Sequence, residues 1–433
     1  MILKNILLSL TVALTLASCG ALNNEVAPKT DEPITNPPSK NIPDAHDASQ
    51  LVDMSFGQAG EISFPKNDIF VPIAVQTSGK VVGFRFDGTL PVGSRAFSLA
   101  RILSDGSADP DFKLQKTYDY APDFLVKVTP EDQILVFAEN VDRSTQVQRF
   151  SPDGELDNTF TSGGVRVQLR AASTCLAPDG KKIIFAGNDI SAGTLRFVRL
   201  NGSGSFDQSF GSNGISTPKF GSSELSGTID TCSVSSSGMV HAVLSTRSET
   251  PQFTPKSIIQ LKSDGSLDPQ FPEKSLDVTR PIVDGMIETQ DGNLVFAARD
   301  TLAYKTYLAK LDTTSKDVAS FAWSTKYESG GMSTAFFEKF GLSSFNKLFE
   351  RADGRLVITA SHGAAGMNLV QLTKDGFADS TAVGGGTTIL ARDGVVLRWS
   401  ALANDQYLYA FFGGSESPEY QTKPSGQLIR LKF

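Results

Sequence analysis

One unit of the chain reads Phe197-Val-Arg-Leu-Asn-Gly-Ser-Gly-Ser-Phe-Asp-Gln-Ser-Phe210. It contains a short apolar strand with one arginine, then a glycine turn, then an Asp-x-x-Phe corner. The same parts recur along the chain, and self-similarity at a regular period is the sequence signature of a repeat architecture. The chain is therefore predicted to consist of copies of one supersecondary unit.

The strand with one long polar residue occurs at seven places. The copies are Leu99-Ala-Arg-Ile102, Val147-Gln-Arg-Phe150, Phe197-Val-Arg-Leu200, Ile258-Ile-Gln-Leu261, Leu308-Ala-Lys-Leu311, Leu369-Val-Gln-Leu372 and Leu428-Ile-Arg-Leu431. The first six are followed by corner aspartates, namely Asp109, Asp157, Asp207, Asp268, Asp317 and Asp379. The seventh corner stands at the other end of the chain, in Leu51-Val-Asp-Met-Ser-Phe56. An N-terminal strand is therefore expected to complete the unit that the C-terminal strand leaves unfinished.

A tight turn precedes an apolar strand in every unit. These turns end at positions 79, 132, 180, 238, 292, 354 and 405, at intervals of 48 to 62 residues. Asp-Gly and Asn-Asp supply the positive φ that such hairpins need. Units of about 50 residues with about four short strands each predict an all-β fold, a single seven-bladed β-propeller over residues 51–433. Its N- and C-terminal strands share one blade, which closes the ring.

The repeated parts resemble the delta-60 repeat, an uncharacterised propeller-forming family. Two copies carry the resemblance best, Ser151-Pro-Asp-Gly-Glu-Leu-Asp-Asn-Thr-Phe160 and Gly204-Ser-Phe-Asp-Gln-Ser-Phe-Gly-Ser-Asn-Gly214. The resemblance covers residues 51–433, and units five to seven depart from it most. It implies a β-propeller fold and no particular activity.

The long polar residue and the corner aspartate are eight residues apart in most units. We interpret the pairs as structural staples that tie the strand to its neighbour through hydrogen bonds. The proposed pairs are Arg101–Asp109, Arg149–Asp157, Arg199–Asp207 and, across the two chain ends, Arg430–Asp53. Glutamine stands in the arginine position in two units, which indicates that hydrogen bonding matters more than charge.

The first residues have the pattern of an export signal. Met1–Asn5 carries one positive charge, and Ile6–Ala17 is an apolar run too short to span a membrane. The run ends in Leu16-Ala-Ser-Cys-Gly20, which resembles a bacterial lipobox. The resemblance implies lipidation of Cys19 and cleavage before it, with palmitate among the acyl chains. An ordinary secretory signal with an incidental Cys19 is the alternative.

The predicted organisation has three parts. Residues 1–18 are the lipoprotein signal peptide, residues 19–50 are the lipidated cysteine and a flexible Pro-rich tether, and residues 51–433 are the propeller. Two or more acyl chains hold a protein stably on a membrane. We therefore expect an exported protein on the outer membrane or cell surface rather than the inner membrane.

The charge balance restricts the partners. The 433 residues contain 40 Lys and Arg against 47 Asp and Glu, a net charge of −7. A nucleic-acid binder normally has a basic patch or domain, so we expect no nucleic-acid partner. Three cysteines and three histidines are too few for a multi-ligand zinc site, and we predict no metal site and no cofactor. We expect a monomer.

Cys175 and Cys232 occupy similar positions before the hairpins of adjacent units. They are expected on neighbouring inner strands, where they form either a disulfide or two buried thiols. We assign structural roles to His241 and His362, and we interpret the Asp-Gly turns as plain turns rather than calcium loops.

The longest interval between turns contains many aromatic residues. If exposed, they would form a binding patch for a partner or glycan; if buried, they would cover the core of their own blade. The candidates are Trp323, Tyr327, Phe336, Phe337 and Phe340.

Two functions fit these features. The first is a non-catalytic cell-envelope lipoprotein whose propeller binds a protein or an envelope polysaccharide. The second is a periplasmic or surface enzyme, such as a hydrolase, lyase or dehydrogenase, with its site in the central channel. No catalytic residues stand out, and the ionisable residues near the inner strands are few: Lys127, Arg170, Asp230, Asp284 and Lys347.

Overall fold

The structure is a computed structural model of the chain. It describes residues 46–65, 67–87, 89, 97–113, 117–118, 125–140, 142–161, 165–220, 223–224, 227–245, 256–268, 271, 274–275, 281–300, 305–311, 313, 332–333, 344–361, 365–392, 395–414 and 426–433. The chain divides into Met1–Ile42 and Pro43–Phe433, and all the described residues lie in the second unit. Within the described part, no helix has the length and apolarity needed to cross a membrane.

Antiparallel sheets of four consecutive strands make up most of this unit. The first holds β3 (Ile69–Val75), β4 (Val81–Phe86), β5 (Phe97–Ile102) and β6 (Thr117–Tyr118), and the second holds β7 (Leu125–Val128), β8 (Ile134–Glu139), β9 (Thr145–Phe150) and β10 (Val165–Val167). The third holds β11 (Leu169–Leu176), β12 (Lys182–Asp189), β13 (Leu195–Asn201) and β14 (Ile215–Ser216). A two-stranded ribbon of β15 (Lys219–Phe220) and β16 (Ser223–Glu224) follows.

The pattern continues in the second half. One sheet holds β17 (Thr228–Val234), β18 (Val240–Ser245), β19 (Lys256–Leu261) and β20 (Lys274–Ser275), and the next holds β21 (Pro281–Glu288), β22 (Leu294–Asp300), β23 (Lys305–Leu311) and β24 (Met332–Ser333). Two more sets are β25 (Ser344–Glu350), β26 (Leu356–Ser361), β27 (Ala365–Leu372) and β28 (Thr387–Ala391), then β29 (Val395–Ala403), β30 (Tyr407–Gly414), β31 (Gly426–Lys432) and β2 (Glu61–Phe64). A short parallel contact between β27 and β29 joins these two sets into one larger sheet.

The strand that pairs with the C-terminal strand comes from the start of the described chain. β2 pairs antiparallel with β31, with Glu61 opposite Ile429 and Phe64 opposite Gly426. The last sheet therefore contains residues from both ends of the folded unit.

The folded unit begins earlier than the predicted boundary at residue 51. β1 (His46–Asp47) pairs in parallel with β28, and the 3₁₀ turn η1 (Ala48–Leu51) follows it. Asp47 accepts a hydrogen bond from the Ser49 backbone, and Ala48 and Leu51 are buried. Residues 46–50, which the sequence assigns to the tether, thus contain a two-residue strand paired with β28 and most of a 3₁₀ turn.

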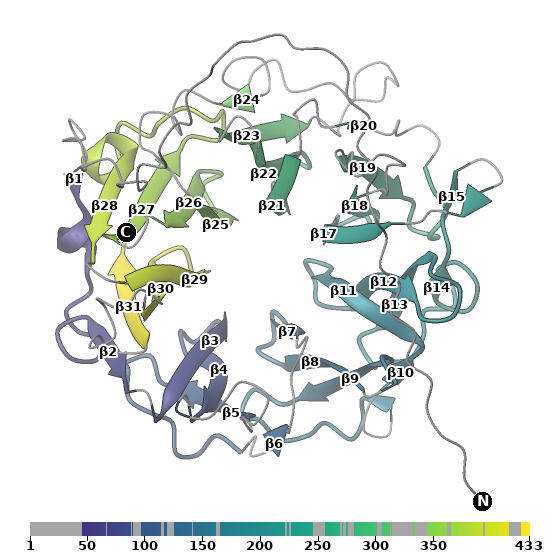
Figure 1. The fold of residues 1–433 in the computed structure, drawn as a ribbon, viewed down its shortest axis with the longest axis horizontal. Helices are drawn as coiled ribbons and strands as arrows, with labels where there is room; N and C mark the ends of the chain where they lie inside the picture. Colours follow the sequence, from purple (N-terminus) through teal and green to yellow (C-terminus); the bar gives the residue numbers. More distant parts are fainter. Residues whose placement is uncertain are drawn as a thin grey trace, which may run out of the picture. The chain divides into compact units, whose positions relative to one another are not determined.

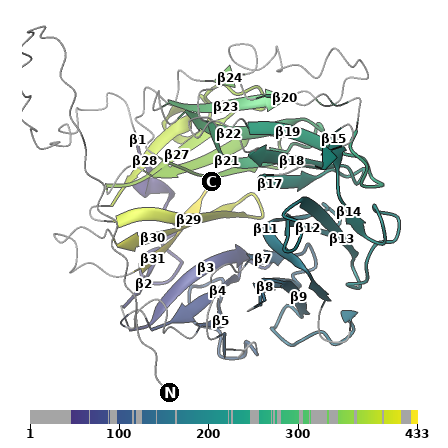
Figure 2. The ribbon, with the colours of Figure 1, turned by 45° about the vertical axis from the view of Figure 1, so that its right-hand side comes forward.

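Neighbouring sheets lie face to face (Figure 2). Apolar side chains from both sheets form buried clusters between them. Phe197 and Phe210 of one sheet, for example, meet Ile229 and Leu244 of the next in one buried cluster. The sheets follow one another around a common centre, with the first strand of each sheet innermost (Figure 1). No α-helix occurs among the described residues. The prediction of an all-β, β-propeller fold is confirmed.

The predicted hairpin turns have the required backbone conformation. All seven closing positions have positive φ, including the non-glycine residues Asp132, with φ 62°, and Asp405, with φ 55°. Aspartate and asparagine tolerate this region better than other side chains with a Cβ atom. Each turn connects the first two strands of its sheet, as in β3–β4 and β21–β22.

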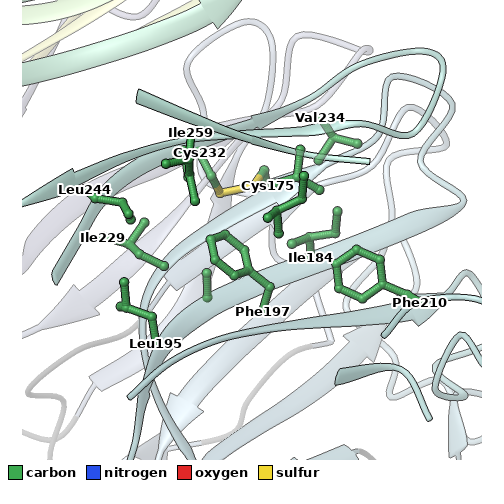
Figure 3. Close-up of a cluster of buried hydrophobic side chains, with 14 of the residues drawn as sticks. Cys175, Ile184, Leu195, Phe197, Phe210, Ile229, Cys232, Val234, Leu244 and Ile259 are labelled. Carbon is green, nitrogen blue, oxygen red and sulfur yellow. A yellow bond between two sulfur atoms is a disulfide. The ribbon is translucent and has the colours of Figure 1, made fainter. Parts of the chain in front are cut away.

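A disulfide joins the innermost strands of two neighbouring sheets. Cys175 on β11 and Cys232 on β17 are bonded, with their Cα atoms 5.9 Å apart. Figure 3 shows this bond inside the apolar cluster that contains Ile184 and Val234. Of the two states that the sequence allows, the structure contains the bonded one.

Candidate functional site

The structure brings together the arginine–aspartate pairs named from the sequence. The Nε–Oδ2 distances are 2.7 Å in Arg101–Asp109, 2.8 Å in Arg149–Asp157 and Arg199–Asp207, and 2.9 Å in Arg430–Asp53. Each guanidinium also lies 4.3 to 4.8 Å from the ring centre of a corner phenylalanine, respectively Phe112, Phe160, Phe210 and Phe56. Each pair therefore belongs to a three-residue Arg–Asp–Phe cluster, in which the guanidinium makes a cation–π contact with the phenylalanine ring.

The aspartate of each cluster also forms hydrogen bonds within its own corner. While Oδ2 of Asp207 binds Arg199, its Oδ1 accepts hydrogen bonds from the backbone and hydroxyl of Ser209, at 3.1 and 2.6 Å. Asp53 and Asp157 bind Ser55 and Thr159 in the same way. One carboxylate therefore shapes the corner and attaches it to the strand.

The guanidinium also reaches the following sheet. Arg101 donates to the Pro152 carbonyl at 2.5 Å and to Asp153 at 2.8 Å, and both residues belong to the next unit. Arg149 donates to the Gly202 carbonyl and Arg430 to the Ser104 carbonyl. The clusters thus join neighbouring sheets as well as strands of one sheet.

Units without arginine replace the contact in different ways. Gln260 donates to Asp268 at 2.8 Å, and Lys310 binds Asp291 at 2.9 Å. Asp317 lies outside the described residues. Asp379 Oδ2 lies 3.1 Å from Nη1 of Arg355, which directly precedes β26. These substitutions explain why the arginine position tolerates other long polar residues.

Other predicted sites lie outside the described residues. This holds for the lipidation site Cys19, for His362 and for all five residues of the aromatic patch, namely Trp323, Tyr327, Phe336, Phe337 and Phe340. The roles given to these residues remain predictions.

A pocket of about 670 Å³ lies where three consecutive inner strands reach their hairpin turns. It is lined by Ile287 and Glu288 of β21, by Leu348, Phe349 and Glu350 of β25, and by Leu402, Asn404 and Asp405 at the turn after β29. Apolar side chains and three carboxylates therefore share one cavity.

Hydrogen bonds between the turns form the rim of this pocket. The Gln290 backbone donates to Glu350 Oε2 at 2.8 Å, and the Ala352 backbone donates to Asp405 Oδ2 at 2.5 Å. Partial burial raises the pKa of Glu350; the hydrogen bond from Gln290 opposes this rise, whereas Asp291 and Asp405 add to it. The carboxylates of the pocket therefore repel one another, and this repulsion disfavours the ionised form of Glu350.

The sequence predictions missed this pocket, although the repeat contains a signal for it. The residue directly before the hairpin turn is apolar in units one to four: Val75, Val128, Leu176 and Val234. The same position holds Glu288 in unit five and Glu350 in unit six. These two consecutive departures from an apolar position could have identified Glu288 and Glu350 as candidate site residues from the sequence.

The ionisable residues proposed for the channel have different surroundings. Lys127 on β7 and Lys347 on β25 retain contact with solvent. Loss of hydration lowers the pKa of both ammonium groups, and the charge of Lys347 adds to the effect on Lys127. The lowered pKa of Lys127 thus has two causes, loss of hydration first and the charge of Lys347 second.

The other three proposed residues have other settings. Arg170 lies 3.4 Å from Glu139, and Asp230 accepts a hydrogen bond from Ser245 at 2.8 Å. The side chain of Asp284 is outside the described part. Asp230 and Asp284 are each the extra residue of a β-bulge in an inner strand. Bulges of this kind often re-aim a side chain.

In the part of the chain that the structure describes, no group of three or more His, Cys, Asp or Glu side chains is arranged to hold a metal ion. The contacts that position Glu350 and Asp405 in the pocket are the hydrogen bonds from the neighbouring turns.

Two segments match a known family. Residues 85–112 and 177–210 match a domain of unknown function, DUF5122, that is described as a β-propeller. Both segments end at a corner phenylalanine and contain a complete cluster, with Arg101 and Asp109 in one and Arg199 and Asp207 in the other. The match supports an uncharacterised β-propeller family. A search of curated proteins finds no match.

Solved structures are similar only at the level of general arrangement. The β-propeller domain of the Trilobed protease from Pyrococcus furiosus is 9% identical with a TM-score of 0.49, and the match covers 81% of this chain and 93% of that one. Kuenenia stuttgartiensis hydrazine synthase is 11% identical with a TM-score of 0.45 and the same coverage. The acylaminoacyl peptidase of Pyrococcus horikoshii is 12% identical with a TM-score of 0.48, over 86% of this chain and 54% of that one.

Removal of an arginine from a cluster should destabilise the fold. Arg101→Met leaves the buried carboxylate of Asp109 without its cation, so we expect a loss of about 3 kcal/mol in the free energy of unfolding, measured by urea denaturation. Lys113→Met removes the exposed Lys113–Glu155 pair and should leave the free energy of unfolding nearly unchanged. Equal losses in both variants would contradict a stapling role.

Glu350→Gln should increase stability at neutral pH. Because the pKa of Glu350 is raised in the fold, the folded state favours its protonated form, and ionisation above that pKa opposes folding. We expect a gain below about 1 kcal/mol at pH 7, since the carboxylate is partly screened by solvent. The gain should shrink as pH falls from the raised pKa of Glu350 toward the ordinary glutamate pKa of about 4.3, and it should be absent well below that value. Thermal melts at several pH values would test this, and a gain that persists at low pH would argue against it.

Proposed function

We propose that the sheets form the seven blades of one closed propeller. Two observations support closure. The inner strands contact one another in sequence and β29 contacts β3, and one apolar cluster contains Tyr409 of the last blade and Phe70 of the first. The Trp399 indole also donates to the Ile73 carbonyl at 3.2 Å, and the Tyr409 hydroxyl donates to the Gly79 carbonyl at 2.8 Å. In this arrangement β2 and β31 share one blade.

We also propose that the protein is a cell-envelope lipoprotein whose propeller acts as a non-catalytic binding module. The observation that carries the binding role is the pocket between the hairpins of three blades. Its carboxylates Glu288, Glu350 and Asp405 would hold a cationic group, and Leu348 and Leu402 would contact the adjoining apolar atoms. The partner is then a protein or envelope polymer with amine or guanidinium groups.

The anchor in this proposal is Cys19. The apolar run Ile6–Ala17 and the lipobox support export and lipidation, and the Pro-rich segment that follows would let the propeller extend from the outer membrane or cell surface. The net charge of −7 argues against nucleic acid and fits a cationic partner.

A specific observation favours the enzyme alternative. An amine with a lowered pKa is more often unprotonated at neutral pH, which makes it a better base or nucleophile. Lys127 and Lys347 have this property on inner strands. A hydrolase or lyase in the channel would then use these amines, and its activity would disappear in Lys127→Met.

Cys19→Ser should release the protein from the membrane fraction. Without the thiol there is no acyl anchor, and the protein should appear in the soluble envelope fraction on immunoblots. Ser18→Ala is the control, because it keeps both the cysteine and a small residue before it. Membrane retention of Cys19→Ser after a high-salt wash would contradict the anchor.

The pocket can be tested with a lysine tripeptide as a cationic probe in isothermal titration calorimetry. The double variant Glu288→Gln/Glu350→Gln should weaken binding at least about tenfold, because a hydrogen bond to a charged group contributes about 1.5–3 kcal/mol. Glu155→Gln changes an exposed carboxylate elsewhere and should bind as the unchanged protein does. Equal weakening in both variants would show that the probe senses only overall charge.

A further inference from the structure

A buried histidine stands directly behind one wall of the pocket. His241 on β18 is 1% exposed, and its ring lies 5.9 Å from that of Phe271. In the other six units the equivalent residue, opposite the staple position, is Val82, Leu135, Ile184, Val295, Val357 or Tyr409. An imidazole therefore replaces a mostly apolar position in one unit only.

Hydrogen bonds determine which ring nitrogen of His241 carries a proton. Gln260 donates through Nε2 to Asp268 Oδ2 at 2.8 Å, so its Oε1 is the atom that faces His241. The His241 Nε2 atom lies 2.8 Å from this oxygen. An amide oxygen only accepts, so Nε2 must carry a hydrogen. In the neutral ring, Nδ1 is then a bare acceptor.

Nδ1 faces another acceptor. It lies 3.6 Å from Oε2 of Glu288, whose side chain is 16% exposed. Both atoms are buried, and neither has a hydrogen-bond partner in the described part of the chain. Two acceptors opposed in a buried place are unfavourable, whereas one proton between them satisfies both. The proton gives either an imidazolium beside a carboxylate or a neutral imidazole beside a carboxylic acid.

The groups around the pair set its electrostatics. From β17, Ser233 lies opposite His241. From β19 comes the neutral Gln260, with Asp268 behind it. On the pocket side, Glu288 shares the cavity with Glu350 and Asp405. These acids favour retention of the proton, whereas the positive charge of Lys310, which pairs with Asp291 and acts on Glu350, opposes it.

We propose that His241 and Glu288 share one proton, and that loss of this proton adds one negative charge to the pocket and tightens its hold on a cationic ligand. The shared proton follows from the contacts alone, whereas its effect on the ligand rests on the proposed function of the pocket. By linkage, a cation that enters the pocket displaces the proton, and acidification weakens binding. The pair thus makes binding sensitive to pH.

Nitrogen-15 NMR of histidine-labelled protein tests the proton directly. We expect Nε2 of His241 to carry a hydrogen at every pH, because it faces the Gln260 amide oxygen, and Nδ1 to gain a proton on acidification, because it faces Glu288. His241→Gln identifies the signal. In Glu288→Gln the Nδ1 change should need a lower pH, because the carboxylate that faces Nδ1 has been replaced by a neutral amide. An Nε2 atom without a hydrogen would contradict the proposal that the two residues share a proton. So would an Nδ1 signal that does not change in Glu288→Gln.

Calorimetry with the lysine tripeptide tests the coupling. Binding to the unchanged protein should be about tenfold tighter above the pH of the Nδ1 change than below it. In His241→Gln this difference should disappear; Glu288→Gln, which changes a less buried residue, provides a second test if His241→Gln unfolds. Binding that is independent of pH would overturn the coupling and leave the pocket intact. An absence of binding at every pH would instead contradict the proposed function. The NMR result would still show whether His241 and Glu288 share a proton.

Discussion

The structure depends on one carboxylate that makes two kinds of bond. At each complete corner, one oxygen of the aspartate holds the turn through the residue two positions later, and the other holds the arginine of the preceding strand. The arginine lies over the corner phenylalanine and reaches the next sheet. Since a buried ion pair stabilises a fold only when its remaining hydrogen bonds are satisfied, this full set of partners is what makes the buried charge tolerable.

The local parts of this arrangement could be predicted from the sequence because each involves residues close together in the chain. The hairpin turns and the pairing of Arg199 with Asp207 both follow from short spacings. The contact of Lys310 with Asp291 could not, because the spacing offered Asp317 as a partner and the choice depends on how two strands lie in space. The strand at His46 was missed because pairing with β28 leaves no trace in a polar sequence.

The candidate pocket could not be predicted from the sequence either, because its residues come from separate sheets. Glu288, Glu350 and Asp405 are far apart in the chain, and only the packing of three sheets brings their turns together. A repeat can nevertheless be compared with itself, and the places where it breaks its own rule are informative. Glu288 and His241 both replace positions that are mostly apolar in other units, and the structure places these two exceptions side by side. Deviations from a structural repeat therefore mark positions whose residue type the repeat alone does not explain.

The pairing of β2 with β31 also has a kinetic consequence. The last sheet gains its outer strand from residues 61–64 and its other strands from residues 395–432, so it cannot be completed until residue 432 has been synthesised. Contacts between distant parts of a chain form slowly because a long loop must close first. A newly made chain therefore stays incompletely folded for a period after its early sheets have emerged. Under the proposed export, such a delay would keep the chain unfolded for passage across a membrane.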